Sequence, residues 1–284
     1  MQPPRCLLTG CAGFVGKHLY SLLLDLGWQV SGADLKDDID IRTYAFHEKY
    51  DVIFHLAANA SIPQSLKNPL ESHSHNVVGT LRLLEYAKNT GATMVFSSSS
   101  SVYGEPEITP TPESALLHPM IPYGLQKLEC EQYMWLYQKL YGVSSVALRY
   151  YNVYGEGMEH ANGGGDSSLA LANFLRQYKS EEPFTIVGNG LQRRDFVYVK
   201  DVALANVLAA QHLCTHEGFD AVNIGSGVNH SILEVADMIS KEHPRLHLPP
   251  RVEPQFGLAN IARAGQLLHW YPVVKLKDWL EKAK

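Results

Sequence analysis

A tyrosine and a lysine stand four residues apart at Tyr123 and Lys127, in the segment Tyr-Gly-Leu-Gln-Lys. On a helix, positions i and i+4 share one face, so this spacing would direct the phenol and the ammonium into the same space. A cation held there favours the phenolate and moves a pKa of about 10 toward neutral pH. The pair therefore predicts a general base for a sugar or alcohol hydroxyl. A solvent-facing pair is the alternative, because both residue types are common.

A glycine-rich segment near the N-terminus predicts a dinucleotide site. Residues Arg5 to Thr9 are typical of a buried strand, and Gly10, Gly13 and Gly16 follow with the spacing G-x-x-G-x-x-G at the start of a helical pattern. Such glycines allow a tight turn and a close approach of the backbone to a pyrophosphate. A second strand pattern ends at Asp34, where a carboxylate would bind the ribose hydroxyls of NAD and repel the 2′-phosphate of NADP. We therefore predict NAD as the cofactor.

Further along the chain, apolar runs alternate with helical patterns, which is typical of a parallel sheet wrapped by helices. We predict strands over Asp51–Leu56, Thr93–Ser97 and Val143–Tyr150, and helices over Val77–Lys88 and Tyr123–Tyr141. The predicted fold is α/β, a Rossmann-type doubly wound parallel sheet with a smaller C-terminal substrate-binding lobe. The stretch between the second and third strands is short, so a strand there is expected to be reduced or lost.

The regular alternation fades after Asn152, where we place the lobe boundary. Residues 1–152 are predicted to form the NAD-binding domain and residues 153–284 mostly the substrate lobe, with 195–225 as a segment that could return to the first sheet. Gly155 to Ser168, which contains three consecutive glycines, is predicted to be a long mobile loop.

Composition excludes several classes of protein. The 284 residues are 45% hydrophobic and carry a net charge of −5, with no basic run, so we expect no nucleic-acid partner. No apolar stretch approaches the roughly 20 residues that span a bilayer, and the first residues do not form a signal peptide. The four cysteines are scattered, which predicts reduced thiols in the cytoplasm. The 13 histidines show no metal-ligand spacing, so we expect no metal.

The ordered motifs of the chain resemble the extended short-chain dehydrogenase/reductase family, in particular its nucleotide-sugar epimerases and dehydratases, and most of all the UDP-hexose 4-epimerases. The resemblance covers nearly the whole chain. The motifs that carry it are Thr9–Gly16, His55–Ala58, Asn76–Thr80, Ser98–Gly104, Tyr123–Lys127, Leu148–Gly155, Gly188–Gly190, Arg194–Val199 and Asn223–Gly225. Where this chain has Gln126, the family often has serine.

The resemblance implies a catalytic set of three residues. Tyr123 would be the acid/base, Lys127 would hold the nicotinamide ribose, and Ser99 matches the family's catalytic serine or threonine. Ser99 also follows a predicted strand, and ligands of open α/β sheets bind at the carboxyl ends of strands. Together with the glycine segment, the resemblance assigns the cofactor residues Gly10, Gly13, Phe14, Val15, Gly16, Asp34, Asp40, Ile41, Leu56, Ala57, Ala58, Asn76, Ser97, Tyr123, Lys127, Tyr150 and Val153.

Substrate-binding residues are predicted mainly in the second lobe. Guanidinium groups suit a diphosphate, and the resemblance makes Arg194 the phosphate ligand. Asn152 matches an asparagine that contacts the sugar or its phosphate. Arg251 is a further candidate, for which a solvated surface arginine is an equal alternative. The remaining predicted substrate-binding residues, Ser99, Ser100 and Tyr123, are expected to contact the sugar.

Gly257 aligns with a position that gates the sugar's 2-substituent in the 4-epimerases. A bulky residue there leaves room for a hydroxyl only, whereas a small residue admits an N-acetyl group. The alternative is that Gly257 serves a turn. If the gate reading holds, the substrate is a UDP-N-acetylhexose, with or without the unacetylated pair.

The reaction class is predicted from the two positions after Ser99. Dehydratases of the family carry an Asp-Glu pair there and the decarboxylases a glutamate at the second position, whereas this chain has Ser100 and Ser101. Neither serine can act as a carboxylic acid, which favours NAD-dependent 4-epimerisation of a UDP-hexose through a 4-keto sugar. A 4-keto reductase, a dehydratase or decarboxylase, and a non-catalytic NAD-binding regulatory protein are the alternatives. The resemblance also implies a homodimer.

Overall fold

The computed structural model describes residues 3–159 and 170–283, whose central feature is a sheet of six strands. The strand order is β2-β1-β3-β4-β5-β9, and every neighbouring pair is parallel. The chain therefore winds outward from β1 in both directions, and the predicted doubly wound parallel sheet is confirmed. The strands are β1 (Arg5–Thr9), β2 (Gln29–Ala33), β3 (Val52–His55), β4 (Thr93–Ser99), β5 (Ser145–Tyr150) and β9 (Phe219–Ile224).

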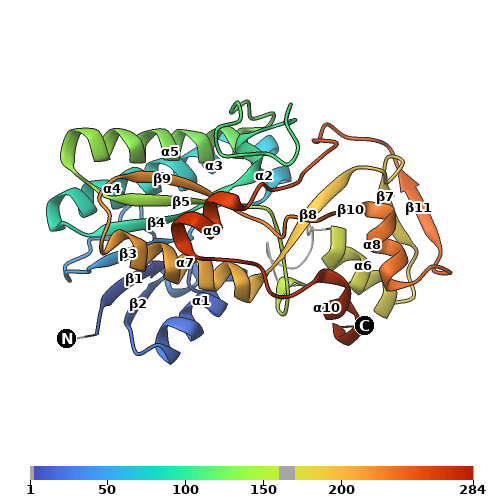
Figure 1. The fold of residues 1–284 in the computed structure, drawn as a ribbon, viewed down its shortest axis with the longest axis horizontal. Helices are drawn as coiled ribbons and strands as arrows, with labels where there is room; N and C mark the ends of the chain where they lie inside the picture. Colours follow the sequence, from blue (N-terminus) through green and yellow to red (C-terminus); the bar gives the residue numbers. More distant parts are fainter. Residues whose placement is uncertain (1–2, 160–169, 284) are drawn as a thin grey trace.

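Helices cover both faces of this sheet, as Figure 1 shows. On one face lie α1 (Phe14–Asp25), α7 (Val199–Leu213) and α9 (Ala262–Leu268), and on the other lie α4 (Gly79–Thr90) and α5 (Pro122–Tyr141). Because both faces are buried, the inner strands are apolar nearly throughout rather than alternating, and all residues of β3 and β5 are buried.

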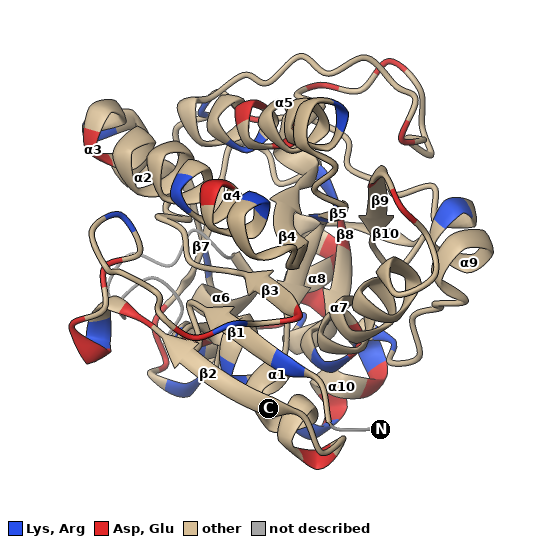
Figure 2. Cartoon of the chain, turned by 90° about the vertical axis from the view of Figure 1, so that its left-hand side faces the viewer, with Lys and Arg blue, Asp and Glu red and all other residues tan. Residues whose placement is uncertain are grey.

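The helical run before the fourth strand is longer than we predicted. It begins with α2 (Ile62–Lys67) and α3 (Pro69–His73), continues as a π-helix over Ser74–Val78, and passes into α4. Proline at the first helical position of α3 favours a helix start there, because its missing N–H would have no partner in any case. Figure 2 shows α2, α3, α4 and α5 on the same side of the sheet.

Between Asp34 and Asp51 the chain contains only a short 3-10 helix, η1 (Leu35–Asp37), and no strand. The predicted loss of a strand is confirmed, and β2 is consequently the edge of the sheet. A second 3-10 helix, η3 (Ser100–Val102), follows β4 directly.

Among the described residues, two small sheets and three helices form a second lobe (Figure 1). Its apolar residues form a core of their own, separate from the two clusters that flank the large sheet. None of the described helices is long and apolar enough to cross a bilayer. The elements of this lobe are β6 (Asn152–Tyr154), β7 (Phe184–Val187), β8 (Arg193–Tyr198), β10 (Asn229–Ser231), β11 (Arg245–Leu248), α6 (Ala170–Lys179), α8 (Ile232–Ile239) and α10 (Leu276–Ala283).

The chain passes between the lobes more than once. Asn152, where we placed the boundary, is the first residue of β6, and β6 pairs with β8 in the small three-stranded sheet. After β8, helix α7 packs against α1, and β9 pairs with β5 at the far edge of the large sheet. Part of the predicted mobile loop, residues 160–168, lies outside the described residues.

A buried ion pair ties α5 to the sheet. The Arg149 guanidinium on β5 contacts the Glu131 carboxylate on α5 at 2.7 Å, and both side chains are 4% exposed. Arg149 also donates to the Tyr103 hydroxyl at 2.8 Å, and the Ser98 hydroxyl donates to Glu131 at 2.5 Å. These bonds satisfy both charged groups inside the protein, as a buried pair requires.

Replacing Arg149 with leucine would leave the Glu131 carboxylate buried without its cation. We expect the free energy of unfolding to fall by about 3–5 kcal/mol, measured by urea denaturation. Replacing Glu131 with leucine as well should recover part of the loss, because neither charge of the pair is then left buried without its partner. The control is Arg176→Leu at the exposed pair with Glu182, where the change should stay below about 1 kcal/mol. An equally small loss for Arg149→Leu would contradict the prediction.

Candidate active site

A cavity of about 670 Å³ opens where β1 to β5 end, the edge at which open α/β sheets bind ligands. It contains residues from both sequence motifs that we singled out, the glycine segment and the tyrosine–lysine pair. The predicted site residues that line it are Gly10, Gly13, Phe14, Val15, Gly16, Asp34, Asp40, Ile41, Leu56, Ala57, Ala58, Ser97, Ser99, Tyr123, Lys127, Tyr150, Asn152 and Val153.

The glycine segment is shaped by close backbone contacts. Gly10 has a φ of 72°, and a Cβ there would lie 2.7 Å from the backbone nitrogen of Ala57. A Cβ on Gly16 would overlap the carbonyl oxygen of Gly10. Only glycine fits both positions, so the turn can bring the N-terminus of α1 to the cavity, where Phe14 and Val15 line the wall. Backbone N–H groups at a helix N-terminus suit the pyrophosphate of a dinucleotide.

Asp34 stands at the end of β2 and joins it to the glycine segment. Its carboxylate accepts from the backbone nitrogens of Ala12 and Lys36, both at 3.0 Å. Each oxygen engages a single N–H, so lone pairs remain for the hydroxyls of a ribose. Asp34 therefore fits the predicted ribose ligand and also fixes the loop that would hold the pyrophosphate.

Asp40 lines the cavity, but its carboxylate is bound by a neighbouring arginine. The Arg42 guanidinium donates to it through Nε at 2.9 Å and Nη2 at 2.6 Å, and this bond lowers the pKa of Asp40 to about 2. Ile41 is buried and packs over Gly79. The cofactor contact predicted for Asp40 would therefore share this carboxylate with Arg42.

Ser99, Tyr123 and Lys127 meet at the cavity from two elements. Ser99 is the last residue of β4, and the other two residues lie on the first turns of α5. The Lys127 Nζ donates to the Ser97 carbonyl at 2.6 Å and lies 5.8 Å from the centroid of the Tyr123 ring. The helical i, i+4 spacing thus brings the phenol and the ammonium to one wall, as predicted.

The predicted effect of Lys127 on the phenol is wrong. Burial raises the pKa of Tyr123 to about 12, because a charged phenolate is poorly solvated there, although a hydrogen bond with Ser99 opposes the rise. Burial likewise lowers the pKa of Lys127 to about 8. The ammonium is directed to the Ser97 carbonyl rather than to the phenol oxygen. Spacing predicted the shared wall, but desolvation by burial sets the direction of both pKa shifts.

The five serines after residue 96 divide into different roles. Ser98 lines the cavity but is buried, and its hydroxyl donates to the Glu131 carboxylate. Ser101 donates to the Ser99 oxygen through its backbone nitrogen at 3.2 Å and its hydroxyl at 2.9 Å, which fixes Ser99 at the cap of η3. Ser100, which we predicted to bind substrate, does not line the cavity.

Asn76, a predicted cofactor ligand, is 2% exposed and does not line the cavity. Its carboxamide binds the backbone of Asn59, accepting from the nitrogen at 2.7 Å and donating to the oxygen at 3.1 Å. Its geometry is that of a support behind the wall. Asn152, by contrast, lines the cavity and donates to the Asp195 carbonyl at 3.0 Å.

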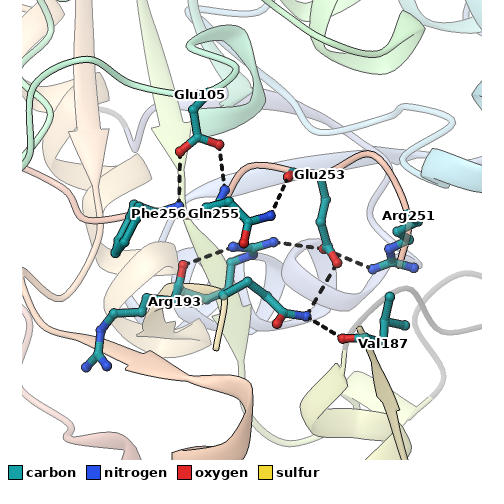
Figure 3. Close-up of polar contacts among 9 residues, drawn as sticks. Glu105, Val187, Arg193, Arg251, Glu253, Gln255 and Phe256 are labelled. Atoms are coloured by element: carbon teal, nitrogen blue, oxygen red, sulfur yellow. Dashed lines mark hydrogen bonds and ion pairs between the residues drawn. The ribbon is translucent and has the colours of Figure 1, made fainter. Parts of the chain in front are cut away.

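Arg194 and Arg251 lie outside the lining of this cavity, around one carboxylate in the second lobe, that of Glu253. Figure 3 shows Arg251 and Glu253. The Glu253 carboxylate accepts from the Arg194 guanidinium at 2.8 Å and from the Arg251 guanidinium at 3.4 Å. Arg194 is 15% exposed and Arg251 is 55% exposed, so only the Arg194 pair is largely shielded from water. Two predicted substrate ligands, Arg194 and Arg251, therefore lie together, and both bind the carboxylate of Glu253.

Gly257 also lies outside the cavity lining, in the segment that follows Glu253. Figure 3 shows Glu105 reaching this segment, where its carboxylate accepts from the backbone nitrogens of Gln255 and Phe256 at 2.6 and 3.3 Å. Gly257 donates to the Arg193 carbonyl at 3.0 Å. Its φ is outside the left-handed region, so no turn there requires glycine.

Several cavity residues were not predicted. Lys17 and His18 follow Gly16 in the first turns of α1, and the helical phase of that segment could have indicated them. Asn59 and Glu156 carry no sequence signal. Glu156 accepts from the Tyr198 hydroxyl and the Trp279 indole, which only the fold brings together. Among residues 3–159 and 170–283, no group of three His, Cys, Asp or Glu side chains is placed to hold a metal ion.

Comparisons with known proteins show that this chain is similar to UDP-sugar epimerases and to a UDP-glucuronic acid decarboxylase. A UDP-glucose 4-epimerase of Halalkalibacterium halodurans is 31% identical over 94% of this chain and 90% of that protein. UDP-glucuronic acid decarboxylase 1 of Danio rerio is 33% identical over 98% of this chain and 71% of that protein. The solved structure of a UDP-N-acetylglucosamine 4-epimerase from Methanobrevibacter ruminantium, in complex with UDP-N-acetylmuramic acid, has a TM-score of 0.89 and 29% identity, covering 100% of this chain and 97% of that one.

The match to a family model covers most of the chain and includes the strand, glycine segment, serines and tyrosine–lysine pair described above. Residues 6–225 match the model described as the NAD dependent epimerase/dehydratase family. Because this model spans well over half of the sequence, the chain belongs to the NAD-dependent epimerase/dehydratase family.

Proposed function

We propose that this protein catalyses the NAD-dependent 4-epimerisation of a UDP-hexose through a 4-keto sugar. The observation that carries the proposal is that Ser99, Tyr123 and Lys127 share one cavity with the glycine segment and Asp34. A dinucleotide held along that segment would reach from the ribose ligand to the phenol. The relatives named above act on UDP-sugars, which supports UDP-hexose as the substrate class.

The chain's own residues would move one proton. Tyr123 takes the proton of the sugar 4-hydroxyl and later returns it, while Ser99 binds the same oxygen and stabilises the charged phenol by a hydrogen bond. Lys127, anchored to the Ser97 carbonyl, would hold the nicotinamide ribose. When bound, NAD supplies the acceptor and donor of the hydride at the sugar's C4. Because the proton and the hydride are both returned, no reagent is consumed.

A dehydratase or decarboxylase is the second candidate, because the zebrafish decarboxylase is similar over nearly all of this chain. Elimination needs carboxylic acids near Ser99, and the two positions after it hold Ser100 and Ser101. Ser101 is engaged with Ser99. We therefore favour epimerisation, and incubation with UDP-glucuronate separates the two, since only a decarboxylase releases carbon dioxide.

Tyr123→Phe tests the proposal directly, because only the phenolic oxygen is lost. We expect interconversion of UDP-glucose and UDP-galactose, followed by chromatography, to fall by about 10²–10⁴-fold while NAD stays bound. Tyr133→Phe, at an exposed tyrosine of the same helix, is the matched control. Activity of Tyr123→Phe above about 1% of wild type would sink the assignment. A reductase would instead consume NADH or NADPH. A non-catalytic NAD-binding protein would neither interconvert the UDP-sugars nor consume the reduced cofactor.

We further propose that Arg194 binds the diphosphate and that Gly257 leaves room for an N-acetyl group at the sugar. The Arg194 guanidinium already binds an anion, the carboxylate of Glu253. A Cβ on Gly257 would meet only the Arg193 carbonyl oxygen, at an ordinary 3.6 Å, so a larger side chain can be introduced there without backbone strain.

Gly257→Tyr should therefore remove turnover of UDP-N-acetylglucosamine and spare that of UDP-glucose, because the ring would occupy the space of the acetyl group. Both substrates are assayed with the same protein, and Phe256→Tyr, at the exposed neighbour, is the control. Equal loss of both activities, or no acetylated activity in the wild type, would refute the gate.

We also propose a homodimer in the cytoplasm, formed through α5. Leu125, Tyr133, Leu136 and Leu140 are exposed and recur at helical spacing on one face of this helix. The cysteines are unpaired, which fits a reducing compartment.

Leu140→Glu should convert the dimer into a monomer by placing a charge in that face, as measured by sedimentation. Lys139→Glu, on the neighbouring exposed position, should leave the dimer intact. A wild-type protein that sediments as a monomer would contradict the dimer.

A further inference from the structure

Gln126 stands beside Lys127 on α5, yet its side chain is 3% exposed and does not line the cavity. It is also the position at which the family often has serine. It contacts Ser72 and Asn76 in the helical run that begins with α2 and passes through α3 and the π-helix into α4. A buried carboxamide at that place must find partners for its oxygen and its nitrogen.

The partner of Gln126 is fixed in orientation by the cavity wall. Asn76, in the π-helix, accepts from the Asn59 backbone nitrogen at 2.7 Å and donates to the Asn59 backbone oxygen at 3.1 Å. This pair of bonds decides which end of the Asn76 carboxamide is oxygen. The second N–H of Asn76 is then left pointing at Gln126, whose Oε1 lies 2.8 Å away.

Gln126 uses both ends of its side chain. The same oxygen accepts from the Ser72 hydroxyl at 2.8 Å, and its nitrogen donates to the Pro69 carbonyl at 3.4 Å. A shorter or apolar residue would leave the Asn76 and Ser72 donors buried without this acceptor, which is costly. Asn59 itself lines the cavity. The bonds therefore run from α5, through Asn76, to the backbone of the wall.

We infer that Gln126 is a positioning residue for the NAD site. It holds the Asn76 carboxamide, which in turn holds the Asn59 segment of the wall at a set distance from the helix that carries Tyr123 and Lys127. The inference rests on the proposed NAD site. It does not depend on which sugar is turned over.

The first test compares Gln126→Ala with Gln132→Ala, an exposed glutamine of the same helix. The dissociation constant of NAD is measured by titration calorimetry on the full chain after release of bound nucleotide, and the melting temperature is recorded for each variant. We expect Gln126→Ala to weaken NAD binding about five- to thirtyfold and Gln132→Ala to leave it unchanged. A lower melting temperature with unchanged NAD affinity would overturn the inference.

Two further variants make the test specific to the Asn76 contact. In a double-mutant cycle, Gln126→Ala and Asn76→Ala should not add, because both break the same path to Asn59. Fully additive losses would overturn the inference. Gln126→Glu keeps an acceptor oxygen for Asn76 and Ser72 and loses only the donor to the Pro69 carbonyl, so it should bind NAD more tightly than Gln126→Ala, and it also serves if Gln126→Ala fails to fold. A loss for Gln126→Glu as large as that for Asn76→Ala would contradict it. A wild-type chain that binds no NAD would refute the cofactor site itself.

Discussion

The junction between β4 and α5 is the constraint on which the site depends. Lys127 of α5 donates to the Ser97 carbonyl of β4 at 2.6 Å. One turn further along α5, the buried Arg149–Glu131 pair fixes the same helix to the sheet. The strand supplies Ser99 and the helix supplies Tyr123. Any shift between the two elements would separate these groups, and the buried bonds between them make such a shift costly.

Burial of the junction between β4 and α5 also shifts the pKa values of the titratable groups there. The pKa of Tyr123 is raised to about 12 and that of Lys127 is lowered to about 8, because both charged forms lose hydration. Ser99 is the group that opposes the rise at the phenol, and Ser101 in turn holds Ser99. The chemistry that we propose therefore depends on hydrogen bonds arranged around the phenol more than on the nearby ammonium.

The second lobe meets this frame through apolar packing as well as polar contacts, since Phe14 and Val15 of α1 pack against the core of the lobe. Within that lobe the Glu253 carboxylate binds Arg194 and Arg251, and Glu105, which follows η3, accepts from the backbone nitrogen of Gln255 just beyond Glu253. A diphosphate that bound Arg194 would compete with Glu253 for the same guanidinium. The Glu253 carboxylate thus occupies the guanidinium at which we propose that phosphate binds.

Features that depend on neighbouring residues could be predicted from the amino-acid sequence. They are the glycine segment, the strands, Asp34 at the end of β2, and the i, i+4 spacing that places Tyr123 and Lys127 on one wall of the cavity. The sequence also indicated the lost strand after Asp34. Two features could be seen only in the folded chain: Asn76 lies behind the cavity wall and binds Asn59, and Glu253 pairs with Arg194. The tertiary structure likewise decided the direction of the Tyr123 pKa shift. These outcomes depend on contacts between distant segments and on desolvation, and no spacing along the chain encodes either one.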